Sequence, residues 1–258
     1  MRGMRALHSP DAVADATPDL LPRWAAQALL PGHPGPGGAA WEHGGAVGVL
    51  APGLNRRERL VLAGPAEGVA AILRDQARAH GPELNPLVPD DLVDAVTALV
   101  PDVVAWAGFG WMESTGPLPS APGVRWLRED ELDTAEALLR KVNPNAYVVP
   151  REPGSRRWAG SHVDGELVAV GADAWSAPHV GFVAGVATHP DFRRRGLSKA
   201  LCSFVVHALL AEHPACALMV EGDNTAAIAA YRGLGFALRG LTILLPAEIA
   251  AARPPRRR

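Results

Sequence analysis

The chain has 258 residues, 48% of them apolar, and its 25 basic and 27 acidic residues give a formal net charge of -2. This composition excludes a disordered chain and predicts a globular protein with a sizeable core. The balanced charge excludes a global attraction to nucleic acid, so any basic site has to be local.

The short apolar runs and the two isolated cysteines indicate which classes of protein the chain does not resemble. The longest apolar runs fall far below the roughly 18 residues that a helical membrane span needs. The basic N-terminus, 1–15, lacks the uninterrupted apolar stretch of a signal peptide. Cys202 and Cys216 lie in apolar segments without metal-ligand spacing, which is typical of reduced, buried thiols. We therefore expect a cytoplasmic protein without a membrane span.

The N-terminal half alternates short strands and helices. In chain order we expect a helix starting near Asp19, a Pro/Gly loop at 31–38, strands at 39–51 and 57–64 with a turn between them, helices at 65–81 and 89–101, and a strand at 102–114. Asp90 or Asp91 is the expected N-cap of the second long helix. This half carries no motif with a chemical role, so we interpret it as structural or as a wall of a substrate site.

A Pro/Gly/Ser connector at 116–123 predicts a boundary between an N-terminal α/β half, 1–122, and a second domain, 123–246. Residues 247–258 are expected to form a basic tail. In the second domain we expect a strand at 124–129, a helix at 130–142, a hairpin at 156–175 turning at Asp164-Gly165, a central strand at 179–190, a helix at 198–213, a strand at 215–223, a short helix at 224–235 and a closing strand at 236–246. This order predicts an α/β (α+β) fold with a mostly antiparallel sheet and one parallel crossover.

The segment "DFRRRGLSKALCSF", 191–204, joins a buried strand to a long helix through a basic turn. Free backbone N–H groups and the positive end of the helix dipole meet at such a helix start. Gly196 lets the backbone approach a ligand closely, and the arginines before it add positive charge. These features predict a site for a phosphate or a diphosphate. The Walker and Rossmann glycine patterns are absent.

Here the chain resembles the GNAT acetyltransferases. Their acyl-CoA loop, R-x-x-G-x-G/A, reads Arg193-Arg194-Arg195-Gly196-Leu197-Ser198, with serine in place of the last glycine or alanine. A second segment, N-x-x-A-x-x-x-Y-x-x-x-G-F, is matched at Asn224, Ala227, Tyr231, Gly235 and Phe236. The resemblance covers about residues 123–246 and implies a mixed sheet with splayed central strands flanked by helices. The N-terminal half lacks the loop, and we interpret it as a degenerate GNAT-like unit without a CoA site.

The resemblance implies roles for individual residues. The positions it assigns to acetyl-CoA are Val186, Ala187, Thr188, Arg193, Arg194, Arg195, Gly196, Leu197, Ser198, Lys199, Asn224, Ala227 and Tyr231. Tyr231 would also be catalytic, because its hydroxyl would protonate the thiolate that leaves. Gly185 could mark the bulge at which the strands splay. The reaction would transfer an acetyl group directly to an amine, with no metal and no acyl-enzyme, and Cys202 would be a core residue.

The general base and the acceptor site are the least determined parts of this reading. Candidate bases are His162, Glu166, Asp173, His179 and His189, but each alone is read more readily as a solvated surface residue, and we assign the role to none of them. Tyr147 and Trp158 could line the acceptor pocket or pack in the core. Trp106, Trp111 and Glu113 could form a wall of that pocket supplied by the N-terminal half, and the alternative is again core packing.

Three functions stay open from the sequence. We favour an acyltransferase of the N-acetyltransferase class that acts on an amine of a small molecule. The alternatives are a catalytically inactive acyl-CoA sensor and an acetyltransferase of protein lysines or N-termini. The expected partners are acyl-CoA and an amine acceptor, without nucleic acid or membrane, and a homodimer stays open. A nucleic-acid binder using Arg193–Arg195 and the arginines of 253–258 is the disfavoured rival.

Overall fold

The structure, a computed structural model, describes residues 3–33, 37–116 and 118–253. The chain forms two compact units, each built from separate stretches of sequence. The first unit comprises Met1–Met112, Met219–Thr225 and Leu238–Arg258, and the second comprises Glu113–Leu218 and Ala226–Ala237. After Leu218 the chain therefore passes to the first unit, returns to the second for Ala226–Ala237, and ends in the first. Our division at residues 122 and 123 stays a prediction about domain organisation.

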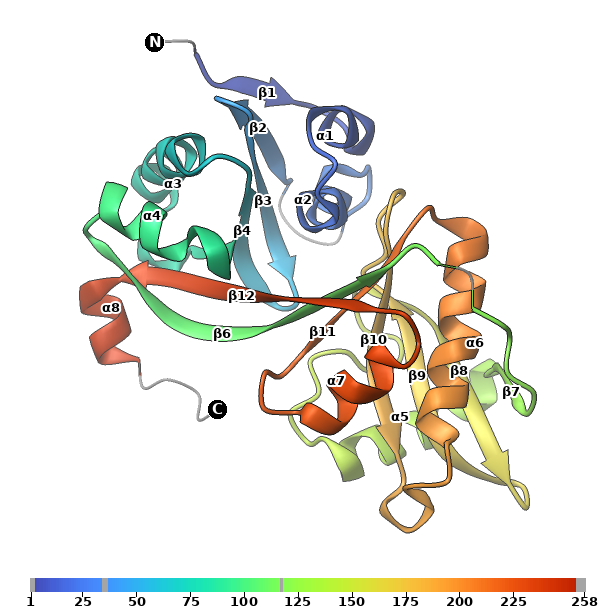
Figure 1. Ribbon diagram of the computed structural model, residues 1–258. Helices are drawn as coiled ribbons and strands as arrows, with labels where there is room; N and C mark the ends of the chain where they lie inside the picture. Colours follow the sequence, from blue (N-terminus) through green and yellow to red (C-terminus); the bar gives the residue numbers. More distant parts are fainter. Residues whose placement is uncertain (1–2, 34–36, 117, 254–258) are drawn as a thin grey trace. The chain divides into compact units, whose positions relative to one another are not determined.

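The first unit is a sheet with helices packed on its strands (Figure 1). Its elements are β1 (Arg5–Leu7), α1 (Pro10–Ala16), α2 (Leu20–Ala25), β2 (Ala39–His43), β3 (Ala46–Leu54), β4 (Arg57–Ala63), α3 (Ala66–His80), β5 (Asn85–Pro89), α4 (Val93–Leu99), β6 (Val103–Ser114), β12 (Ala237–Pro246) and α8 (Ala247–Ala252). The strand order is β1-β2-β3-β4-β5-β12-β6. The late strand β12 pairs antiparallel with β5, with Leu241 opposite Pro89 and Ile243 opposite Leu87.

Local sequence explains several of these elements. Asp19 caps α2 by accepting a hydrogen bond from the Leu21 N–H at 2.8 Å, and the helix starts where the sequence predicts it. α3 ends at Gly81, whose φ of +67° suits glycine. Its apolar face, with Val69, Ile72 and Leu73 fully buried, packs on β2, β3 and β4. Burial of this apolar face against the strands therefore stabilises α3.

Some expectations for the first unit are wrong. The strand expected at 39–51 is a hairpin, because Gly44 and Gly45 both take positive φ and turn the chain between β2 and β3. The stretch Asn85–Pro89, left without a strand, forms β5. Neither Asp90 nor Asp91 is the N-cap of α4: they lie in a short 3-10 turn, and the Asp90 carboxylate accepts a hydrogen bond from the Thr242 hydroxyl. Residues 247–252 form the helix α8, and 254–258 lie outside the described residues.

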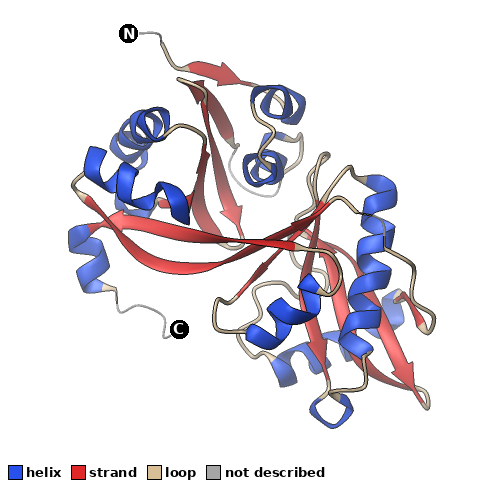
Figure 2. Cartoon of the chain, in the orientation of Figure 1, coloured by secondary structure: helices blue, strands red, loops and turns tan. Residues whose placement is uncertain are grey.

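The second unit contains the sheet β11-β10-β9-β8-β7. Its elements are β7 (Val124–Trp126), α5 (Leu132–Val142), β8 (Ser155–Val163), β9 (Glu166–Ala174), β10 (Gly181–Thr188), α6 (Leu197–Glu212), β11 (Cys216–Val220) and α7 (Thr225–Arg232). The hairpin at Asp164-Gly165 is confirmed as the turn between β8 and β9. α5 and α6 both pack on β9 and β10, which explains why β9 is buried along most of its length (Figure 2).

The central strands of the second unit part from one another at one point. β10 runs parallel to β11, but the two pair only over Gly181–Val183. On its other side, the register of β10 with β9 shifts between Ala184 and Ala187, so a bulge lies at Gly185, as predicted. Gly185 has a φ of +63° and lies close to the Trp158 ring. The fold class is confirmed as a mixed, mostly antiparallel sheet with splayed central strands.

Candidate functional site

The turn between β10 and α6 is exposed and shaped by two residues in the left-handed region. Arg194 has a φ of +62° and Gly196 a φ of +77°. Arg193, Arg194, Arg195 and Gly196 are all exposed, and a Cβ on Gly196 would have no atom within 4 Å. The Arg195 guanidinium lies over the Phe192 ring at 4.9 Å, and its Nη2 donates to the Asp191 carbonyl at 3.4 Å. The turn therefore offers open space beside three positive charges.

The start of α6 supplies hydrogen-bond donors to this turn. Gly196 is its N-cap and provides no side chain to bind the first N–H groups. Leu197, Ser198 and Lys199 form the first turn, where backbone N–H groups have no partner within the helix. The helix is 16 residues long, so its dipole adds positive potential at this end. Donors, dipole and arginines together suit a bound phosphate or diphosphate.

The edge of β10 that is not paired with β11 leads toward this turn. Beyond Val183, β10 has no pairing with β11, so Val186, Ala187 and Thr188 lie on the stretch where the strands have parted. The Thr188 Oγ1 is shielded from solvent and makes no hydrogen bond to the described residues. Backbone groups on such an edge can bind an extended ligand as a further strand would.

Tyr231 lies near the end of α7 and is half-buried. Its ring is 6.0 Å from that of Phe236, and the Phe236 N–H donates to the Tyr231 carbonyl at 3.1 Å. Burial raises the pKa of the Tyr231 phenol well above its usual 10, and the neighbouring Cys202 raises it further. The phenol therefore keeps its proton at neutral pH and can act as an acid.

The other positions of the second motif divide between the two units. Asn224 is exposed, directly precedes α7 and belongs to the first unit. Its N–H donates to the Glu221 carbonyl at 3.0 Å. Ala227 lies in the first turns of α7 and belongs to the second unit, with Tyr231. The cofactor roles of these residues stay predictions.

Two of the proposed acceptor-side aromatics are core residues. Trp158 is 2% exposed, and its Nε1 donates to the Ser155 hydroxyl at 2.7 Å. Trp111 is fully buried in the first unit, 5.4 Å from the Trp24 ring. Tyr147 is half-buried and stacks on Trp175 with ring centroids 5.5 Å apart. Trp106 and Glu113 are half-buried, and the Trp106 Nε1 donates to the Arg253 carbonyl at 3.0 Å.

The candidate bases differ in how accessible they are. Asp173 is fully buried: it accepts a hydrogen bond from Ser176 at 2.5 Å and pairs with Arg156 and Arg157 at 3.2 and 3.1 Å. This buried carboxylate is held by two arginines, which favours a structural role for Asp173 over that of a general base. His189 lies 2.7 Å from the Lys141 Nζ, and its Nδ1 faces the Asp191 N–H at 3.3 Å. Glu166 is exposed and His179 half-buried, and their roles stay predictions.

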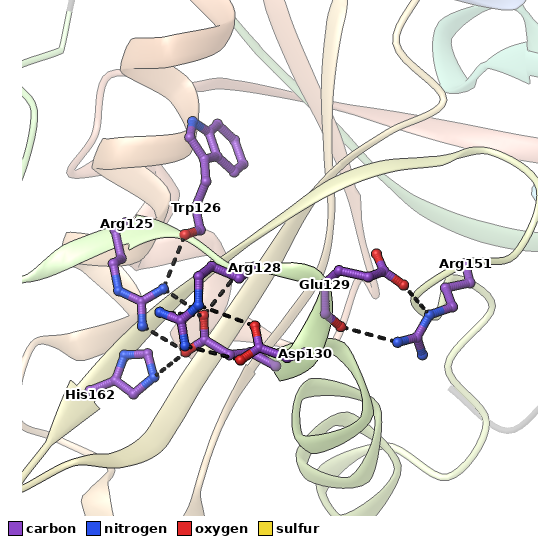
Figure 3. Close-up of polar contacts among 8 residues, drawn as sticks. Arg125, Trp126, Arg128, Glu129, Asp130, Arg151 and His162 are labelled. Atoms are coloured by element: carbon purple, nitrogen blue, oxygen red, sulfur yellow. Dashed lines mark hydrogen bonds and ion pairs between the residues drawn. The ribbon is translucent and has the colours of Figure 1, made fainter.

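His162 belongs to a separate charged cluster at the edge of the second unit (Figure 3). Its Nε2 lies 3.3 Å from Glu131, whose two carboxylate oxygens bind the Arg125 guanidinium at 2.6 and 2.7 Å. The Arg125 guanidinium and the Arg128 backbone N–H hold the pKa of Glu131 down at about 2. These residues line a cavity of about 590 Å³ with Gly123, Val124 and Gly165. Glu131, which is held by Arg125, is therefore a structural partner of His162.

Three findings concern the rest of the described chain. Cys202 and Cys216 are confirmed as free, buried thiols. Within residues 3–33, 37–116 and 118–253, no group of three or more His, Cys, Asp or Glu side chains is arranged to hold a metal ion. No helix among these residues is both long and apolar enough to cross a membrane.

A known protein family matches the part of the chain that contains the basic turn. Residues 123–236 match the family described as Acetyltransferase (GNAT) family. This range contains β10, the basic turn, α6 and Tyr231.

Two curated relatives match shorter segments. A 90-residue segment is 36% identical to a mycothiol acetyltransferase of Streptomyces griseus and covers 33% of this chain and 28% of the relative. A 68-residue segment is 38% identical to the acetyltransferase SG1711 of Sodalis glossinidius and covers 26% of this chain and 48% of the relative. The chain thus matches less than half the length of each relative.

A solved structure is similar over nearly the whole chain. It is a GNAT-family acetyltransferase from Colwellia psychrerythraea, with a TM-score of 0.51, 11% identity, and coverage of 94% of this chain and 99% of that one. At this identity the likeness concerns the fold alone.

Proposed function

Residues 123–236 match the acetyltransferase (GNAT) family, and on this premise we propose that the protein is an acetyl-CoA-dependent N-acetyltransferase. The observation that carries the proposal is the turn between β10 and α6. It combines Gly196 at a φ of +77°, three exposed arginines and the start of a 16-residue helix. A diphosphate matches this arrangement of donors and charge.

The remaining parts of acetyl-CoA would follow β10. Its edge at Val186–Thr188 is unpaired with β11, and it can receive the amide groups of the pantetheine arm. A backbone N–H on the same edge would stabilise the oxyanion that forms on the thioester carbonyl. The thioester sulfur would then lie near Tyr231, whose phenol is protonated at neutral pH.

The proposed chemistry is a direct transfer. A neutral amine attacks the thioester carbonyl carbon, a C–N bond forms, and the tetrahedral intermediate expels the CoA thiolate. Tyr231 donates its proton to that sulfur, and the amine gives up a proton to a base or to water. A phenol that keeps its proton at neutral pH supports the enzyme over the alternative of an inactive acyl-CoA sensor.

We propose a small-molecule amine as the acceptor, and protein lysines or N-termini are the second candidate. A transfer assay decides between them: purified protein and acetyl-CoA are mixed with a panel of small amines and with histone-like peptides, and free CoA thiol is measured. Turnover on small amines supports the proposal. Turnover on peptides alone would overturn the acceptor assignment but keep the chemistry.

A matched pair of variants tests the binding site itself. Gly196→Asp adds a negative charge where the diphosphate would bind, without meeting any protein atom. Gly123→Asp is the control, because Gly123 has the same φ of +77°, also has no atom within 4 Å, and lies outside the turn. Both substitutions strain the backbone alike, so a difference between them in acetyl-CoA affinity reports on the ligand.

Calorimetry with acetyl-CoA is the readout. We expect micromolar-range binding by the unsubstituted protein and by Gly123→Asp, and a loss of at least about tenfold for Gly196→Asp from charge repulsion. Equal affinities for the two variants would show that the diphosphate does not bind at this turn.

A further inference from the structure

The Phe192 ring joins a histidine to the last arginine of the turn between β10 and α6. The rings of His189 and Phe192 meet edge to face, with centroids 5.6 Å apart and an interplanar angle of 79°. The Arg195 guanidinium carbon lies over the Phe192 ring, 4.9 Å from its centroid. Phe192 is half-buried, whereas Arg195 is exposed. The ring therefore supports a guanidinium group that solvent and a ligand can reach.

His189 is held by contacts with two other elements of the second unit. Lys141, in the last turn of α5, places its Nζ 2.7 Å from the His189 Nε2. The His189 Nδ1 lies 3.3 Å from the Asp191 N–H and 3.8 Å from the Asp191 carboxylate. The His189 backbone N–H donates to the Val168 carbonyl of β9 at 2.8 Å. With a side chain only 12% exposed, His189 is fixed between α5, β9 and the turn.

Arg195 differs from the other two arginines of the turn. Its Nη2 donates to the Asp191 carbonyl at 3.4 Å, and its face lies on the Phe192 ring. Among the described residues, the side chains of Arg193 and Arg194 make no hydrogen bond, ion pair or ring contact. One arginine of the three is thus held in a defined position before any ligand binds.

We propose that Phe192 and His189, the latter held by Lys141, are positioning residues that keep Arg195 in place to bind the diphosphate of acetyl-CoA. The inference rests on the proposed function, which supplies this ligand. A long side chain loses conformational freedom when it binds, and a ring that already restricts it lowers this loss. The contact with the ring uses the face of the guanidinium group, so N–H groups at its rim stay available to phosphate oxygens.

A matched pair of substitutions at Phe192 tests the role of the ring. Phe192→Tyr keeps the aromatic face under Arg195, whereas Phe192→Leu keeps an apolar side chain without it. In calorimetry with acetyl-CoA we expect the leucine variant to bind about three- to tenfold more weakly than the tyrosine variant. The control ligand is S-acetylpantetheine, which lacks the diphosphate and is titrated by NMR. Its affinity should be equal for both variants, and a matching loss there would show general damage to the turn and overturn the role.

A second pair of variants tests the contact from α5. Lys141→Met and Arg140→Met each remove one positive charge from the last turn of this helix, but Arg140 pairs with Glu136 instead of His189. We expect Lys141→Met to bind acetyl-CoA about threefold more weakly than Arg140→Met. In a Phe192→Leu background this difference should vanish, because Lys141 acts through the ring. A difference that persists would show that the Lys141 charge acts on the ligand directly and would overturn its anchoring role.

A double-mutant cycle decides whether Phe192 acts through Arg195. If it does, Phe192→Leu combined with Arg195→Met binds acetyl-CoA about as weakly as Arg195→Met alone; additive losses would contradict the inference. Tighter binding by Phe192→Leu would show that the ring holds Arg195 away from the ligand, which also overturns it.

The same titrations separate this inference from the proposed function. If the expected pattern of affinities appears but no amine is acetylated, the proposed enzyme activity fails and the positioning role stands. If acetyl-CoA binds and the leucine and tyrosine variants are alike, the positioning role fails and the proposed function stands. Absence of acetyl-CoA binding by the unsubstituted protein would overturn both.

Discussion

Replacement of Gly185 by alanine tests the bulge that parts the central strands. A Cβ at this position would lie 2.5 Å from Cη2 and 3.0 Å from Cζ3 of Trp158, and 3.1 Å from the Val148 Cγ1. The Trp158 ring cannot move away easily, because it is buried and its Nε1 is hydrogen-bonded to Ser155. The added methyl group therefore meets a fixed aromatic ring.

The substitution lowers the free energy of unfolding through two effects. A non-glycine residue at a φ of +63° costs about 1–2 kcal/mol. Overpacking against the ring adds about 1–3 kcal/mol. The sum, about 2–5 kcal/mol, predicts a fall in Tm of at least about 4 °C for a protein of this size. Acetyl-CoA affinity should fall as well, because the bulge sets the course of Val186–Thr188.

Thermal unfolding followed by circular dichroism measures the effect, with Gly165→Ala as the control. Gly165 has a φ of +84° but no atom within 4 Å of its Cβ position, so only the backbone term applies. Adding Trp158→Phe to Gly185→Ala should recover part of the loss, since the smaller ring leaves room. A Gly185→Ala variant as stable as Gly165→Ala would refute the close approach of the ring.

Three other predictions follow from the contacts. The fragment 123–258 should fail to fold in circular dichroism and size-exclusion experiments, because β12, with Leu241 and Leu244 fully buried, loses its partner β5; a folded monomeric fragment would contradict this. Asp173→Ala should lower the free energy of unfolding in urea by about 2–4 kcal/mol, since two arginines lose a buried carboxylate, and a change under 0.5 kcal/mol (about the scatter of surface substitutions) would speak against the ion network. The Tm difference between the unsubstituted protein and Glu131→Gln should be present above pH 4.5 and disappear as the pH falls toward 2, because the folded-state pKa of Glu131 is lowered to about 2; a difference independent of pH would refute the pairing with Arg125.

The sequence predicts those elements whose signals are local. The hairpin at Asp164-Gly165 carries its own turn residues, and the basic turn before α6 lies between two strongly apolar segments. The break at Gly44-Gly45 was equally local, but the apolar residues on both sides suggested one continuous strand. β5 is not predictable in this way because its five residues include Pro86 and Pro89 and show no alternation of apolar and polar side chains.

Local sequence signals do not predict which strands pair over long range or which side chains contact one another. Nothing in residues 236–246 indicates that the strand pairs with β5, since an apolar strand fits many partners. The apolar context of Cys202 predicts a core residue, and its burial agrees with that. In contrast, the ion network of Asp173 joins residues from β8, β9 and α6.

Tyr231→Phe tests the central claim most directly, because it removes one oxygen atom from the proposed acid and leaves the ring in place. The measurement compares kcat from CoA release with the Kd for acetyl-CoA from calorimetry, on the best amine found in the acceptor panel. The account predicts that kcat falls about 100-fold or more while Kd changes by less than about threefold. Unchanged turnover, or a loss confined to acetyl-CoA binding, would contradict it.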